Sequence, residues 1–173
     1  MVLVMVVSMG LNYYLYHQNK GFKMSIGSDY LVTVRQTLFE LNTPIDFWIE
    51  ELNKDNSDVL LERYKGELET LADDFSDING KIGMIGDQLR TLSDLYSELE
   101  NTMRETDDKE NISEIREEIV KYQHFIVEIL KDMENKLEED KLLWYQELSN
   151  PDSETTNKVW DEFKTFEKLQ SGS

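Results

Sequence analysis

The feature that most constrains the fold is a line of apolar residues that recurs every seven positions between residues 61 and 103. Its members alternate in steps of three and four, so both core positions of six successive heptads are apolar. A straight helix drifts by about 20° per heptad, so such a line predicts a left-handed coiled-coil-like surface. The line has thirteen members: Leu61, Tyr64, Leu68, Leu71, Phe75, Ile78, Ile82, Ile85, Leu89, Leu92, Tyr96, Leu99 and Met103.

We expect residues 57–105 to form one continuous helix, about 70 Å long at about 1.5 Å per residue. Gly80, Gly83 and Gly86 lie inside it, and each costs a helix about 1 kcal/mol relative to alanine. We favour the continuous helix, with a hinge or a close backbone contact at the glycines, because the apolar line keeps its phase through them. The alternative is a turn at Asn79–Gly80. In either case the three glycines are candidate partner-binding residues.

A second apolar line begins after the polar segment 104–110. Asn111 and Glu114 form a possible capping box at its start, and the line continues to residue 148 with one change of phase. We therefore expect an antiparallel hairpin of 57–105 against 111–148. Val120, Phe125 and further apolar residues widen the second stripe, which indicates more than one neighbouring helix.

Shorter helices are expected on both sides of this hairpin. Ser28 or Asp29 can cap one of them, and Thr43-Pro44-Ile45-Asp46 is a start signal for another. A last helix follows residue 152. Three tryptophans lie on apolar helical faces, where core packing is the first interpretation and partner binding the alternative. These candidate partner-binding residues are Trp48, Trp144 and Trp160.

The chain divides into four parts by composition. Residues 1–16 carry no charged side chain and are a candidate membrane anchor. Residues 17–27 contain two glycines and no helical stripe, which predicts a connector. Residues 28–170 form the helical bundle, and residues 171–173 are a small polar tail.

The uncharged N-terminal segment has three interpretations. As a helix it reaches only about 23 Å, less than the roughly 30 Å of a bilayer core. We favour a short membrane anchor, with Tyr13, Tyr14 and Tyr16 at the interface; the alternatives are a signal peptide and a buried core element. Lys20 and Lys23 follow the segment and nominally favour a cytoplasmic bundle. The lack of cysteine is compatible with export, and we expect a bundle outside the cytoplasm, with the cytoplasm as the alternative.

Composition excludes several classes of function. With 36 acidic and 18 basic side chains, the formal charge of −18 repels nucleic acid. The chain has no cysteine and only two histidines, His17 and His124, and Lys121 stands where a Glu-x-x-His metal motif needs glutamate. The sequence contains no phosphate-binding loop and no nucleophile motif. We expect no catalytic residue, metal, cofactor or small-molecule substrate.

Together these patterns predict an all-α, elongated bundle built on a long antiparallel hairpin. The function we expect is that of a non-enzymatic, membrane-tethered interaction module: a receptor-like domain, scaffold or assembly subunit that binds a protein partner or a second copy through its heptad lines. The alternative is a soluble coiled-coil adaptor or a small secreted helical protein. This interpretation depends on the thirteen residues forming one unbroken ridge that another helix covers.

Overall fold

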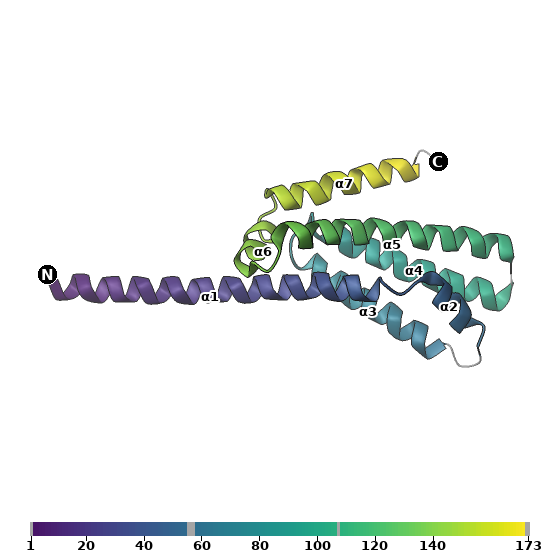
Figure 1. The fold of residues 1–173 in the computed structure, drawn as a ribbon, viewed down its shortest axis with the longest axis horizontal. Helices are drawn as coiled ribbons and strands as arrows, with labels where there is room; N and C mark the ends of the chain where they lie inside the picture. Colours follow the sequence, from purple (N-terminus) through teal and green to yellow (C-terminus); the bar gives the residue numbers. More distant parts are fainter. Residues whose placement is uncertain (1, 55–57, 107, 172–173) are drawn as a thin grey trace.

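The computed structural model describes residues 2–54, 58–106 and 108–171, and every regular element in these ranges is an α-helix (Figure 1). The long helices α3, α4 and α5 pack side by side in antiparallel contacts, which confirms the predicted all-α class. The helices are α1 (Val2–Glu40), α2 (Ile45–Leu52), α3 (Asp58–Ser76), α4 (Gly83–Glu105), α5 (Lys109–Leu137), α6 (Lys141–Leu148) and α7 (Glu154–Ser171).

The other four described helices lie around the three-helix core of α3, α4 and α5. The second half of α1 lies along the bundle, and its first half extends away from it (Figure 1). The short helix α2 lies at one end of the bundle and α6 at the other, while α7 returns over α5. The predicted tail, 171–173, falls outside the described residues except for Ser171, which ends α7.

The predicted continuous helix over 57–105 is wrong. The apolar ridge bends between α3 and α4, so the turn at Asn79–Gly80 is the correct alternative. The Asn79 side-chain oxygen accepts from the amides of Lys81 and Ile82, at 2.9 and 3.1 Å, and its Nδ2 donates to the carbonyl of Leu148 at 2.5 Å. These bonds stabilise the corner and join it to the end of α6.

The two halves of the ridge cover each other, and the α4 half also packs on α5. Eleven of its thirteen residues are buried, and Ile78 and Met103 are partly buried against the same core. The sequence pattern therefore identified the core correctly. The predicted antiparallel hairpin of 57–105 against 111–148 is present as α4 against α5. Its first arm bends back on itself, so α3 packs antiparallel on α4 as a third helix.

One of the three central glycines, Gly86, lies where the two halves of the ridge approach closely. A Cβ on Gly86 would lie 2.4 Å from the carbonyl oxygen of Ala72, so α3 and α4 approach closely there. A Cβ on Gly83 would be 3.5 Å from Ser76 Cα, and one on Gly80 would meet no atom within 4 Å. The close contact that we predicted as one role for this cluster thus lies within the chain, between the two halves of the ridge.

Substituting Gly86 by alanine should destabilise the hairpin. The added methyl group must separate two helix backbones, and overpacking of this kind costs about 1–3 kcal/mol. Gly66 on α3 is the matched control, because a Cβ there meets nothing within 4 Å and alanine should gain up to about 1 kcal/mol of helix propensity. Urea unfolding of the two variants measures the difference; an equal gain for both would contradict the close contact.

Two predicted helix starts differ from the structure. The N-cap of α5 is Asp108, whose carboxylate accepts from the amides of Glu110 and Asn111, so the start lies before the predicted Asn111 box. At α2 the expected cap does not form: Pro44 takes the cap position without a side-chain bond. Asp46 instead binds Arg116 of α5, at 3.0 and 3.3 Å, so tertiary pairing replaces local capping.

The predicted connector, residues 17–27, is also helical. It continues α1 without a break, so neither Ser28 nor Asp29 begins a helix. The sequence shows no apolar stripe here because the first part of the segment is exposed and its last residue, Gly27, packs by its backbone against α6.

Candidate functional site

The first half of α1 is the most exposed apolar feature of the molecule. Every residue from Ser8 to Phe22 is exposed, and Figure 1 shows this stretch extending beyond the bundle. Its large side chains include Met9, 71% exposed, and Tyr13, 68% exposed. The four consecutive residues 13–16 are all large, apolar or aromatic, and exposed. Because successive helical residues are about 100° apart, these four residues place apolar or aromatic groups on every side of the helix at this turn.

The base of the projecting helix is fixed to α6 and the end of α5. A Cβ on Gly27 would lie 1.8 Å from the carbonyl oxygen of Lys141, so the two helix backbones touch. Farther along α1, Arg35 donates to Glu134 at 2.7 Å and to Glu139 at 2.5 Å. The hydrogen bond from Arg35 lowers the pKa of Glu139. Steric fit and charge together hold α1 in place.

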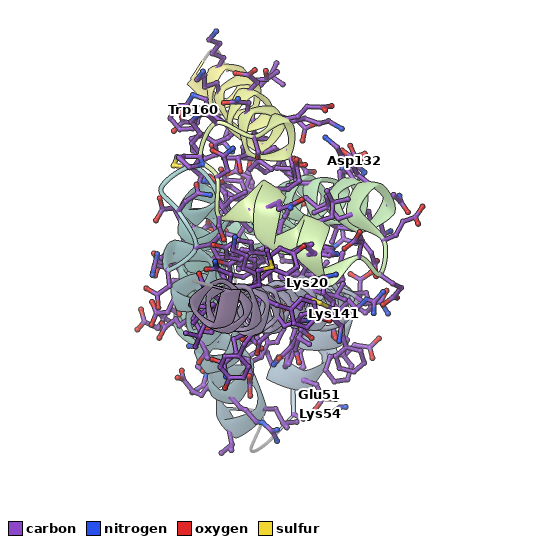
Figure 2. All side chains as sticks on the ribbon, turned by 90° about the vertical axis from the view of Figure 1, so that its left-hand side faces the viewer. Lys20, Glu51, Lys54, Asp132, Lys141 and Trp160 are labelled. Carbon is purple, nitrogen blue, oxygen red and sulfur yellow. The ribbon has the colours of Figure 1, made fainter. Side chains whose placement is uncertain are left out.

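The three tryptophans have different environments. Trp48 is buried and stacks on Tyr64, with ring centroids 4.6 Å apart. Trp144 is completely buried, and its indole N–H donates to the carbonyl of Glu138 at 2.9 Å. Trp160 is only half-buried and lies at the outer edge of the molecule on α7 (Figure 2). Of the three, Trp160 is the one whose surface a partner can reach.

A polar corner fixes the start of α7. The carboxylate of Glu147 accepts from the amide and the hydroxyl of Thr155, at 3.0 and 2.7 Å. These bonds, the Thr155 hydroxyl first, lower the pKa of Glu147. Ser153 is the N-cap residue: its Oγ accepts from the amide of Thr156 at 3.1 Å. Ser153, Thr155 and Thr156 are buried, so α7 leaves the bundle at a defined angle.

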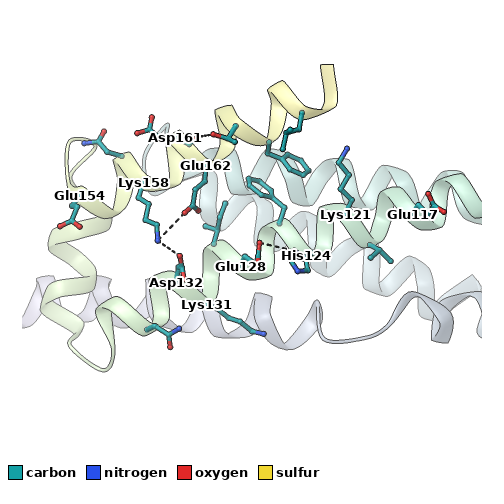
Figure 3. A pocket seen from close by; sticks show the side chains of 18 residues that line it. Glu117, Lys121, His124, Glu128, Lys131, Asp132, Glu154, Lys158, Asp161 and Glu162 are labelled. Atoms are coloured by element: carbon teal, nitrogen blue, oxygen red, sulfur yellow. Dashed lines mark hydrogen bonds and ion pairs between the residues drawn. The ribbon is translucent and has the colours of Figure 1, made fainter. Parts of the chain in front are cut away.

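An open groove of about 1450 Å³ runs between α5 and α7 (Figure 3). Apolar side chains line part of it, including Val120, which is 44% exposed, and Leu169, which is 65% exposed. Phe125 and Phe166 stack within it with parallel rings 4.0 Å apart. The wide apolar stripe of α5 predicted a further neighbour, and α7 covers only part of that stripe.

Ionisable groups with shifted pKa values also occur inside the bundle. Burial opposes the charge of Lys65, but hydrogen bonds to Glu62 and Glu100 raise its pKa. Burial raises the pKa of Tyr64 to about 12 and also raises that of Tyr96. Lys65 joins α3 to α4 through Glu100, with a Nζ–Oε2 distance of 3.2 Å, and the two tyrosine rings pack edge to face. The Lys65–Glu100 pair and the Tyr64–Tyr96 pair therefore stabilise the packing of α3 on α4.

Neither a metal-ion cluster nor a membrane-spanning helix occurs in the described part of the chain. No group of three or more His, Cys, Asp and Glu side chains there is placed to hold a metal ion. Among the helices of the same ranges, none combines the length and the apolar character needed to cross a membrane.

The fold and its surfaces define an all-α bundle with a projecting apolar helix and an open groove. No family model matches the sequence, and no curated protein or solved structure matches the chain. The projecting helix and the groove are therefore the two surfaces that can indicate a function.

Sequence reasoning missed Gly27 and the groove. Gly27 was placed in a connector, although a lone glycine followed by the apolar spacing of residues 31–41 is compatible with a close helix crossing. The groove combines residues 117–135 of α5 with residues 154–169 of α7, which are far apart in the chain, so only the broad stripe of α5 signalled it.

Proposed function

We propose that this chain is a non-enzymatic helical interaction module that the N-terminal half of α1 tethers to a membrane. The observation that carries the proposal is the all-round apolar surface of the projecting helix. A helix that is apolar on every side is stable when it is covered on every side, as in a large core or in lipid. The described bundle leaves Ser8 to Phe22 exposed, and lipid is a solvent that can surround them.

The order of residues along α1 supports insertion of its N-terminal half into the bilayer, although the two lysines by themselves nominally favour a cytoplasmic bundle. The uncharged segment 1–16 comes first and contains the tyrosines, whose amphipathic rings favour the membrane–water interface. Lys20 and Lys23 follow, next to the part of α1 that packs on α6. In this proposal the segment inserts among the acyl chains, the lysines lie at the headgroups, and the bundle stands outside the cytoplasm. A cytoplasmic bundle is the alternative.

The surface that we propose for partner binding differs from the one expected from the sequence. The heptad lines of residues 61–103 are buried inside the chain, so they do not offer the docking ridge that the sequence suggested. The groove that α5 and α7 line together is a surface that a protein partner can reach. We therefore propose that the tether holds the bundle at the bilayer with these two helices accessible to a partner.

Flotation with phosphatidylcholine vesicles tests the tether. The full chain should float with the vesicles, whereas the double variant Leu11→Asp/Leu15→Asp should bind at least about tenfold more weakly. Each aspartate costs up to about 2.5–3.5 kcal/mol in hydrocarbon, less near the interface, and 1.4 kcal/mol corresponds to tenfold. Val32→Asp/Phe39→Asp is the matched control: both residues are exposed on the bundle half of the same helix, and this variant should float like the unmodified chain.

Two results would overturn the tether. One is equal flotation of both double variants. The other is a full chain that stays in solution and self-associates through Leu11 and Leu15, as measured by sedimentation. In that case a second copy of the helix covers the apolar surface, and the soluble coiled-coil alternative is correct.

A further inference from the structure

The groove between α5 and α7 has the length of a helix-binding site. Its lining residues extend on α5 from Glu117 to Asn135 and on α7 from Glu154 to Leu169. At about 1.5 Å per residue, these stretches are about 27 and 22 Å long, which matches a helix of four or five turns.

Both ends of α7 are held, and the groove lies along the stretch of α5 and α7 between these two points. At its start, the Glu147 and Ser153 bonds fix the corner with α6. Near its end, the hydroxyl of Tyr122 on α5 donates to Gln170 at 3.1 Å. The stacked rings of Phe125 and Phe166 lie between these points and give the groove an apolar floor.

The charges around this floor are mainly negative. Six carboxylates line the groove, against three lysines. Lys158 is already paired with Asp132 at 2.5 Å and lies 3.6 Å from Glu162, while Lys121 lies 5.6 Å above the ring of Phe166 (Figure 3). The carboxylates are Glu117, Glu128, Asp132, Glu154, Asp161 and Glu162.

This charge pattern determines which kind of partner fits. A second copy of the chain carries a formal charge of −18 and is repelled, as are anionic headgroups and nucleic acid. A helix with a leucine-rich face and flanking lysine or arginine satisfies both the apolar floor and the acidic rim. We infer that the α5–α7 groove binds a basic amphipathic helix of a partner protein.

The inference deepens the proposed function by naming the surface and the chemistry of its partner. The tether is tested by flotation and the groove by peptide titration, so either can fail while the other stands.

A site-specific probe can report the groove directly because the chain has no cysteine. Val120→Cys on the full chain, labelled with acrylodan, places an environment-sensitive dye at the floor, and Val59→Cys on α3 is an exposed control outside it. The ligand is a peptide of about eighteen residues with leucines at i, i+3, i+4 and i+7 and lysines elsewhere. We expect a saturable blue shift at position 120 and none at position 59.

Two comparison peptides separate charge from hydrophobicity. One has the same leucines with glutamates in place of lysines; the other has the same composition in an order without an apolar face. Both should bind at least about tenfold more weakly than the basic amphipathic peptide. Raising the salt concentration should also weaken the basic peptide, because screening shortens the reach of exposed charges.

Charge reversal in the chain locates the site. Glu117→Lys/Glu128→Lys, in the Val120→Cys background, should weaken the basic peptide about tenfold. Glu69→Lys/Asp94→Lys, on the exposed faces of α3 and α4, changes the net charge equally and should have little effect. Circular dichroism checks that each variant remains helical. Equal losses in the two variants, equal binding of all peptides, or an equal response at position 59 would overturn the inference.

Discussion

Replacing Gly27 by alanine should destabilise the protein by about 2–3 kcal/mol, in the upper part of the range for overpacked sites. The new methyl carbon would lie 1.8 Å from the carbonyl oxygen of Lys141 and 2.9 Å from the amide nitrogen of Tyr145. Both are backbone atoms of α6, so no side-chain rotation can make room. Either α1 or α6 must shift, and the core contacts of Trp144 and Leu148 on α6 shift with it.

Gly21 provides the control on the same helix. A Cβ there meets nothing within 4 Å, and alanine should stabilise the exposed helix by up to about 1 kcal/mol. Urea unfolding followed by circular dichroism should therefore shift the two variants in opposite directions. If Gly27→Ala were as stable as Gly21→Ala, α1 and α6 would not cross at this point, and the direction in which the apolar half of α1 projects would have another cause.

The sequence predicted the helices and most of the core, and the reason is periodicity. Apolar residues in steps of three and four mark a helical face that is buried. The pattern is the same whether a separate helix or the other half of the same ridge packs on that face. The period therefore could not tell a straight helix from a hairpin. The bend depends on the side chain of Asn79 and on the space that Gly86 leaves beside Ala72, which are tertiary features.

The surfaces that the function depends on were harder to predict. The apolar character of residues 1–16 was evident from the sequence. Residues 17–27 were expected to form a connector, but α1 continues through them. They show no apolar stripe because α1 contacts α6 there through the backbone of Gly27. The wide apolar stripe that includes Val120 indicated the groove. Its acidic rim could not be predicted without knowing where α7 lies. That position is set by the Glu147 corner, a network of side-chain and backbone bonds that periodicity does not encode.

Replacing Trp144 by alanine should cost about 3–5 kcal/mol, the range measured for large aromatic residues removed from a core. Its side chain is completely buried in α6. Its indole N–H also bonds the carbonyl of Glu138, the residue with positive φ that ends α5. Trp144→Phe keeps most of the buried ring and leaves that carbonyl without its donor, so a smaller loss of about 1–3 kcal/mol is expected.

Trp160→Ala is the matched comparison. The ring is half-buried beside Phe163 on α7, with centroids 6.1 Å apart, and Lys164 lies 4.8 Å above it. Its removal should cost roughly 1 kcal/mol, because it opens no deep cavity. Urea unfolding of the three variants ranks them. A loss at Trp160 as large as that at Trp144 would contradict the half-buried position of the Trp160 ring.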